Sequence, residues 1–450
     1  MLSAFTNSFK IPELRERILF TLGLIFAVRI TACVPVPGVD YNALREVITE
    51  IGRQAGGGFL GLYDLFTGGA MDRCAVGALG IMPYISASII LQLMTAVVPA
   101  LERLAREGDA GRQRITQYTR YLTVALCLVQ GGALAGAMLH PQATFGMDRD
   151  IVHMESHFGF LVLAVLTMTT GTMLQMWLGE QITARGIGNG ISLIITINII
   201  SRLPGAVQQT INMFQPVGDE RQFSIFHLAL MLILIFLVIA GVIAVTQAQR
   251  KIPVQYAKRV VGRKVYGGQS TYMPLRVNYA GVMPIIFAQS ILMFPPKVFR
   301  ALPWTWAKDF GAAIDYGTGA YMALYTLMIL FFSYFWVATQ FNPVRIADDL
   351  KKYGGYVPGI RPGTPTAEFL DHTMTRVTLA GAVFLTIIAV IPSVMQQNLG
   401  IPWIVASFFG GTSLLIVVGV MLDTMRQVES QLLMRHYDGF LKKGKLRSRR

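Results

Sequence analysis

Ten stretches of this sequence are apolar over about 20 residues, the length that an α-helix needs to cross the hydrocarbon core of a membrane. Backbone polar groups in lipid must bond internally, so each such stretch has to be helical. Only 14% of the 450 residues are charged, against about 25% in soluble domains. The sequence therefore predicts an all-α polytopic membrane protein. The predicted spans are residues 18–38, 75–98, 118–139, 157–178, 187–207, 225–248, 281–299, 321–340, 377–395 and 401–422.

The fifth and the seventh predicted spans contain prolines that would make them short or broken. Pro204 lies in the fifth span, and the seventh contains Pro284 and the pair Pro295–Pro296. A proline inside a helix removes one backbone hydrogen bond. We therefore predict both spans to be short or broken, as helices that line a protein-enclosed cavity often are.

Positive charge is distributed unevenly between the two sides of the membrane. Ten spans put both termini on one side, and most of the 39 Lys and Arg residues lie in the tails and loops of that side. Acidic residues divide almost evenly. The positive-inside rule then predicts that both termini are cytoplasmic. The net charge of +14 needs no nucleic-acid partner as its first explanation.

The predicted spans contain almost no group that could support catalysis or ion coupling. Arg29 is the clear exception, and it needs a partner or a route to the membrane surface. Coupled transporters normally place Asp, Glu or His near the midplane. The three cysteines have no metal-binding spacing, and no nucleotide-binding or nucleophile motif is present. We predict no catalytic residue, metal or cofactor, so a secondary transporter for a small substrate and a membrane enzyme are the weaker alternatives to a passive channel.

A short apolar segment, "FLGLYDLFTGG" at residues 59–69, lies between the first two spans. It is too short to cross the membrane. Glycines at both ends suit a mobile, re-entrant segment. An interfacial anchor helix is the alternative.

Two loops on the cytoplasmic side, 249–278 and 341–376, are longer than topology requires. The first contains seven Lys and Arg residues and no acid, and its "KIPVQYA" and "RKVYGG" segments alternate as in a short hairpin. The second contains a helix-like "RIADDLKKYG" followed by a tip rich in Gly and Pro. The positive charge of the first loop can serve either to dock a partner or only to orient the protein in the membrane.

Isoleucines recur at helical spacing in spans that carry Gly, Ser, Thr, Pro and Gln but no charge. In "GIMPYISASIILQL", residues 80–93, Ile81 and Ile85 lie four positions apart. An apolar ring can close a pore to ions by dewetting. This pattern is typical of a channel that accepts bulky and chemically varied cargo.

Four longer segments carry a family resemblance. "GALGIMPYISASIILQL", "LGEQITARGIGNGISLII", "YVPGIRPG" and "FGGTSLLIVVGVMLD" resemble the signature segments of the SecY family of bacterial protein-translocation channels, and the similarity covers nearly the whole chain. The resemblance implies ten helices in two pseudo-symmetric halves of five around an hourglass pore. These halves would be residues 1–207 and 208–422, followed by a basic cytoplasmic tail, 423–450.

The resemblance also assigns roles to residues. The pore ring falls on Ile81, Ile85, Ile191, Ile195, Ile286 and Ile416. The segment 59–69 becomes the plug below this ring, with the apolar side chains of Phe59, Leu60, Leu62, Tyr63, Leu65 and Phe66. The second and seventh spans would form a lateral gate, where Gln92 and Gln289 either bridge the closed gate or make ordinary packing contacts.

The implied partners are SecE and SecG subunits, the SecA motor ATPase, the ribosome, preproteins with their signal peptides, and lipid of the bacterial plasma membrane. The channel would be passive, and SecA or the translating ribosome would supply the energy. The candidate docking residues are Arg250, Lys251, Lys258, Arg259 and Arg361. Such charges contribute salt-dependent affinity for ribosomal RNA. Lys251 stands where many relatives have arginine, so it keeps the charge without the planar fork.

Overall fold

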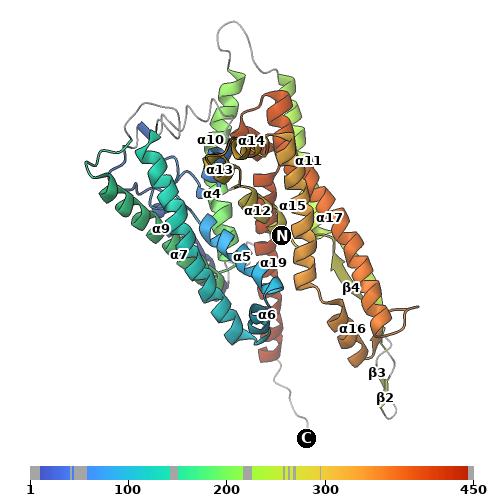
Figure 1. Ribbon diagram of the computed structural model, residues 1–450. Coiled ribbons are helices and arrows are strands. Elements are labelled where there is room, and N and C mark those ends of the chain that lie inside the picture. Colours follow the sequence, from blue (N-terminus) through green and yellow to red (C-terminus); the bar gives the residue numbers. More distant parts are fainter. Residues whose placement is uncertain are drawn as a thin grey trace. The chain divides into compact units, whose positions relative to one another are not determined.

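The structure is a computed structural model that describes residues 11–40, 43–44, 58–141, 151–215, 225–256, 259–261, 264–266, 270–293 and 295–443. The described chain is mostly helical (Figure 1). Seven of its helices are long and apolar enough to cross a membrane, or eight if one bent pair counts as a single span. The predicted all-α polytopic fold is confirmed, and the count of ten spans stays a prediction.

The chain divides into two compact units. The first unit contains Met1–Ser224, Pro402–Phe408 and Ile416–Arg450, and the second contains Ile225–Ile401 and Phe409–Leu415. The helices of the first unit are α2 (Pro12–Thr31), α4 (Gly58–Thr67), α5 (Met82–Val97), α6 (Pro99–Arg106), α7 (Asp109–Leu139), α9 (His157–Arg185) and α10 (Gly190–Phe214), with most of α18 (Trp403–Gly410) and α19 (Thr412–Lys443).

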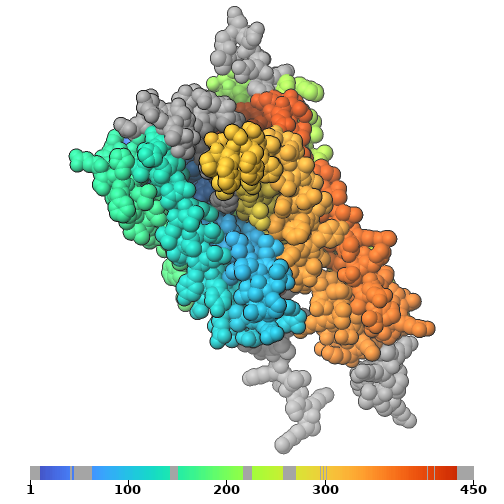
Figure 2. Space-filling view, in the orientation of Figure 1, coloured from blue at the N-terminus to red at the C-terminus, as the bar shows by residue number. Residues whose placement is uncertain are grey.

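Helix α9 is central to the packing of the first unit, where it contacts α2, α7 and α10. A Cβ atom on Gly171 of α9 would lie 2.1 Å from the carbonyl oxygen of Val76, so only glycine permits this approach. The outer faces of α7 and α9, teal to green in Figure 2, expose large apolar side chains such as Val129, Phe158 and Leu166. These faces suit contact with hydrocarbon rather than with water.

The second unit combines helices with a small sheet. Its elements are α11 (Ile225–Gln247), β1 (Gln249–Tyr256), β2 (Arg259–Val261), β3 (Lys264–Tyr266), β4 (Ser270–Arg276), α12 (Met283–Leu292), α13 (Pro295–Ala301), α14 (Thr305–Ala313), α15 (Gly319–Gln340), α16 (Pro343–Lys352), β5 (Gly355–Tyr356) and α17 (Thr364–Leu399). The predicted helix in "RIADDLKKYG" is confirmed as α16. The strand order β4-β1-β5 joins residues of both long loops in one antiparallel sheet.

The hairpin prediction for the first loop was right about strands and wrong about their pairing. Strand β1, which contains most of "KIPVQYA", pairs with β4, so that Ile252 lies opposite Met273. The strand in "RKVYGG" is β3, and it pairs with β2 instead. Ile252 and Val254 alternate with exposed residues and are buried. Ile252 joins a core cluster with Phe341 and Leu370, which favours the longer pairing.

The second span begins later than its hydropathy indicates. Residues 75–81 are irregular: Val76 and Gly77 donate to the carbonyl oxygens of Val34 and Thr31, at the end of α2. Helix α5 starts at Met82, with Pro83 in its first turn. Proline fits that position because the amide it lacks has no helical partner there. Pro83 therefore marks the start of the helix and not a break within it.

One prediction about broken spans was wrong. Helix α10 runs without interruption through Pro204, because the loss of one hydrogen bond need not end a helix packed among others. The tenth predicted span, 401–422, contains a one-residue interruption between α18 and α19 at Gly411, where φ is +147°. A Cβ atom there would lie 2.5 Å from the carbonyl oxygen of Ile388, so the close approach of α17 requires glycine at this position. The predicted break in the seventh span is confirmed between α12 and α13.

Candidate functional site

Helix α4, which contains most of the predicted plug segment, is seated inside the first unit. The side chains of Tyr63, Leu65 and Phe66 are each at most 5% exposed. The hydroxyl of Tyr63 donates to the carbonyl oxygen of Leu79 at 3.1 Å. This burial differs from that of an interfacial anchor helix. The side chains of Phe59, Leu60 and Leu62 lie outside the described part of the structure.

The seat of α4 lies directly before the helix that carries two of the predicted ring isoleucines. Gly80 has φ +58°, and a Cβ atom there would lie 3.0 Å from Cγ2 of Thr67, the last residue of α4. Ile81 follows at once, fully buried, and the amide of Ile85 donates to its carbonyl oxygen at 3.1 Å. The structure therefore brings the C-terminal end of α4 next to the start of α5.

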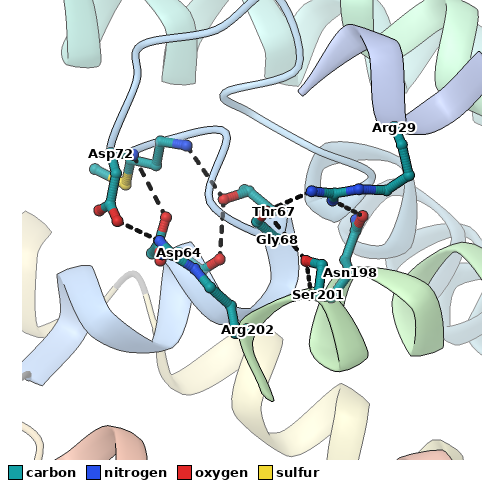
Figure 3. Close-up of polar contacts among 9 residues, drawn as sticks. Arg29, Asp64, Thr67, Gly68, Asp72, Asn198, Ser201 and Arg202 are labelled. Carbon is teal, nitrogen blue, oxygen red and sulfur yellow. Dashed lines mark hydrogen bonds and ion pairs between the residues drawn. The ribbon is translucent and has the colours of Figure 1, made fainter. Parts of the chain in front are cut away.

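The C-terminal end of α4 presents carbonyl oxygens that the helix itself cannot pair. Asn198 of α10 donates through Nδ2 to the carbonyl oxygen of Phe66 at 2.8 Å. The carbonyl oxygen of Gly68 accepts from Nη2 of Arg29 at 3.1 Å and from Oγ of Ser201 at 3.2 Å (Figure 3). A helix C-terminus carries about half a negative charge, so a guanidinium there is stabilising.

These contacts give Arg29 the polar partners that a cation in an apolar span needs. Arg29 lies in the last turn of α2, and its Nη1 atom donates to Oδ1 of Asn198 at 3.1 Å. The same Asn198 amide therefore accepts from α2 and donates to α4. Gly68, at φ +65°, leaves room for the guanidinium, because a Cβ atom there would lie 2.5 Å from Nη1 of Arg29.

Arg202, one helical turn beyond Asn198 on α10, pairs with two carboxylates. Its Nη2 atom contacts Asp64 of α4 and Asp72 of the following loop, and all three side chains point toward one another in Figure 3. The amide of Asp72 also donates to Oδ1 of Asp64 at 3.4 Å. Because the carboxylate of Asp64 is only 13% exposed and that of Asp72 29%, water screens these pairs less than a surface ion pair. Charge-assisted contacts of this kind are worth roughly 1.5–3 kcal/mol each.

Sequence reasoning missed most of this polar cluster. Asn198, Ser201 and Arg202 lie at positions i, i+3 and i+4 of an apolar helix, so they share one face. That spacing was the available signal. The partners Asp64 and Asp72 lie more than a hundred residues away in sequence, where periodicity gives no information.

The predicted ring isoleucines are mostly buried. Ile195 of α10 and Ile416 of α19 are at most 2% exposed, and so is Ile286 of α12 in the second unit. Ile191 is only half-buried, in the first turn of α10, where Oδ1 of Asn189 accepts from its amide at 3.1 Å. Of the two predicted gate residues, Gln92 on α5 is half-buried and Gln289 on α12 of the second unit is 8% exposed.

The predicted docking residues lie on the sheet and on a loop of the second unit. Arg250 and Lys251 are exposed on β1. Arg361 is exposed between Gly359 and Gly363, which have φ of +82° and +104°, and its carbonyl oxygen accepts from Thr366 Oγ1 at 2.8 Å. Lys258 and the side chain of Arg259 fall outside the described residues. Among the residues described, no three His, Cys, Asp or Glu side chains could hold a metal ion.

Several helices long enough to cross a membrane, together with a short apolar helix buried in the first unit, define a polytopic membrane protein. The comparisons with known proteins identify the family within this class. A family model described as SecY matches residues 75–425, and the chain belongs to the SecY family.

Relatives of known name share the full length of the chain. It is 47% identical to "Protein translocase subunit SecY" of Streptomyces scabiei over 98% of this chain and 100% of that one. The protein of the same name from Mycobacterium tuberculosis is 44% identical over the same shares.

Solved structures share the fold at low sequence identity. One, described as "The structure of a protein conducting channel", aligns with TM-score 0.59 and 17% identity over 94% of this chain and 96% of that chain. Another, described as "Sec61 in the Canine ribosome-channel complex from the endoplasmic reticulum", aligns with TM-score 0.57 and 17% identity over the same shares.

Proposed function

We propose that this chain is the channel subunit of a protein translocase, which passes unfolded secretory polypeptides across the membrane and releases transmembrane helices sideways into lipid. The observation that carries the proposal is the seat of α4, a short helix buried in the first unit of a SecY-family chain. The full-length relatives are named as translocase subunits. The channel is passive, and a partner motor or the ribosome supplies the energy.

In this proposal α4 is the plug and the six isoleucines, assigned by family resemblance, form the ring that seals the resting pore. The contact of Thr67 with Gly80 supports the assignment, because it puts the plug beside the segment that leads into Ile81 and Ile85. Apolar side chains at a constriction exclude water and therefore ions.

For the lateral gate the proposal names Gln92 of α5 and Gln289 of α12. In each side chain the Oε1 atom is buried and has no hydrogen-bond partner among the described residues. Gln92 donates through Nε2 to Oγ of Ser88 at 3.3 Å. A buried acceptor without a donor is destabilising, so a donor from a neighbouring helix would stabilise the closed gate.

For docking, the proposal assigns the exposed cations of the second unit to SecA or the ribosome. Arg250 and Lys251 project from a strand that pairs on both edges, and Arg361 lies between two glycines with left-handed backbone. A rigid setting reduces the entropy lost when such side chains bind a partner. Lys258 and Arg259 complete the set by resemblance.

The remaining assignments also rest on the resemblance. The protein works in the bacterial plasma membrane with both termini in the cytoplasm, alongside SecE and SecG subunits. Its halves are 1–207 and 208–422, and 423–450 is the basic tail. Preproteins and their signal peptides are the cargo.

Reconstitution tests the proposed function. Vesicles that contain the full chain with its accessory subunits, supplied with SecA and ATP, should protect a preprotein from external protease. Arg361→Glu should reduce this protection about tenfold at unchanged protein abundance, because it reverses the charge at the docking tip. Arg112→Glu, on an exposed position of α7, is the matched control and should change it less than twofold.

Two outcomes would count against this reading. Vesicles that take up a small solute but protect no preprotein would favour the secondary-transporter alternative. Equal loss of abundance and transport in Arg361→Glu would make Arg361 a folding residue.

A further inference from the structure

We infer that the polar contacts around the end of α4 form a latch, and that Arg202 is its central residue, which must release Asp64 before α4 can leave its seat. The latch consists of Asp64, Asp72, Arg202, Arg29, Asn198 and Ser201 together with the carbonyl groups of Phe66 and Gly68. The inference rests on the proposed function, because a latch has a role only if α4 moves.

The first support is that most of these contacts join α4 to two other helices, α2 and α10. Asp64, Phe66 and Gly68 belong to α4 and to the residue after it. Arg29 belongs to α2, and Asn198, Ser201 and Arg202 belong to α10 (Figure 3). Displacing α4 therefore breaks the ion pair of Asp64 and three hydrogen bonds at once.

The second support is the charge that displacement would leave behind. Arg202 would lose Asp64 and keep Asp72, and Arg29 would lose the carbonyl oxygen of Gly68 and keep Asn198. Both guanidiniums lie on apolar helices, where the loss of one of two polar partners is unfavourable for a cation. The seated position of α4 is favoured for this reason in addition to its apolar contacts.

The third support is that polar contacts fix the orientation of α4, which apolar contacts do not. Burial of Leu65 and Phe66 stabilises the packing of α4 in the first unit, but apolar contact alone does not fix the rotation of α4 about its own axis. Asn198, Ser201 and Arg202 lie on one face of α10, and their bonds to the carbonyl oxygens of Phe66 and Gly68 and to Asp64 set the position of the helix end. The latch is therefore a positioning device for the plug.

Resting ion conductance in planar bilayers tests the latch without any motor. Arg202→Gln and Asp64→Asn should each raise the conductance of the full complex about tenfold. The double variant should conduct no more than Arg202→Gln alone, because Arg202→Gln already removes the pair with Asp64. Arg202→Lys keeps the positive charge, so its resting conductance should remain within about threefold of that of the unsubstituted protein.

The control is Arg120→Gln, which removes an ion pair with Glu180 between α7 and α9 and does not touch α4. It should leave the conductance unchanged. Asp72→Asn is a milder second variant, because it keeps the pair of Arg202 with Asp64. It should fold normally and raise the resting conductance about threefold over that of the unsubstituted protein.

The outcomes separate the latch from the proposed function. If the latch variants keep the conductance of the unsubstituted protein while the vesicles still translocate a preprotein, the latch is overturned and the proposed channel function is unaffected. An unsubstituted protein that translocates nothing would overturn the channel instead. An equal leak from Arg120→Gln would show that the effect comes from general destabilisation, which also overturns the latch.

Discussion

At the scale of the residue, the amide of Asn198 explains why a polar side chain is tolerated so deep in α10. It is 1% exposed, it accepts from Arg29 through Oδ1, and it donates to Phe66 through Nδ2. The two contacts fix the orientation of the amide, since its two ends are not interchangeable. Aspartate could accept from Arg29 but could not donate to Phe66, and leucine could do neither.

Cysteine reactivity gives a prediction at the same scale. Cys33 is exposed, whereas Cys74 is buried with its Sγ 3.5 Å from Sδ of Met138, and burial raises the pKa of the Cys74 thiol to about 12. The thiolate is the reactive form, so the Cys74 thiol stays protonated and unreactive at pH 8. A maleimide should label Cys33 and leave Cys74 unmodified, as mass spectrometry of reconstituted protein would show.

The control for this prediction is the same protein after denaturation in detergent, in which both thiols should react. Labelling of Cys74 at the rate of Cys33 in the native membrane would contradict the buried environment of the loop after α4.

At the scale of the element, a proline does not by itself decide where a membrane helix breaks. Pro204 lies within α10 without ending it, whereas Gly411 separates α18 from α19. The difference is in the surroundings: α17 approaches Gly411 so closely that no side chain fits. A proline is visible in the sequence, but the neighbour that makes a glycine necessary is not.

The break at Gly411 predicts the effect of adding a single methyl group. Gly411→Ala should destabilise the protein by about 2–4 kcal/mol, because the Cβ atom meets the carbonyl oxygen of Ile388 and the backbone angle suits only glycine. Gly136→Ala in α7 is the matched control, since nothing lies within 4 Å of its added Cβ atom. Thermal inactivation of both variants in the same detergent measures the difference, and equal half-lives would contradict the close approach.

At the scale of the whole molecule, the proposed ring predicts a leak that does not depend on the latch. Ile81→Asn, Ile191→Asn and Ile416→Asn should each raise resting ion conductance, because an amide holds water where isoleucine excludes it. Ile200→Asn is the matched control on α10, since Ile200 is 37% exposed. Conductance recorded in planar bilayers should rise severalfold in the first three variants only; unchanged values in all four would remove the ring from the proposal.

The spans and the family could be predicted from the sequence because a membrane permits few structures and the signature segments are long. The length of segment 59–69 and its flanking glycines predicted a segment too short to cross the membrane, and the family resemblance assigned it as a plug. The contacts that hold it were not, since Arg29, Asp64 and Arg202 come from three separate parts of the chain. The pairing of β1 with β4 was missed for the same reason: alternation identifies a strand but not its partner.

The contacts of Arg29 have a consequence for the order in which the chain is made. Its partner Gly68 follows 39 residues later, and its partner Asn198 follows 169 residues later. Until α10 has been synthesised, Arg29 lacks its partner Asn198. Arg29 lies in the last turn of α2, where its long side chain can still reach hydrated headgroups. The polar contacts that hold the end of α4 can therefore form only after nearly half of the chain has been synthesised.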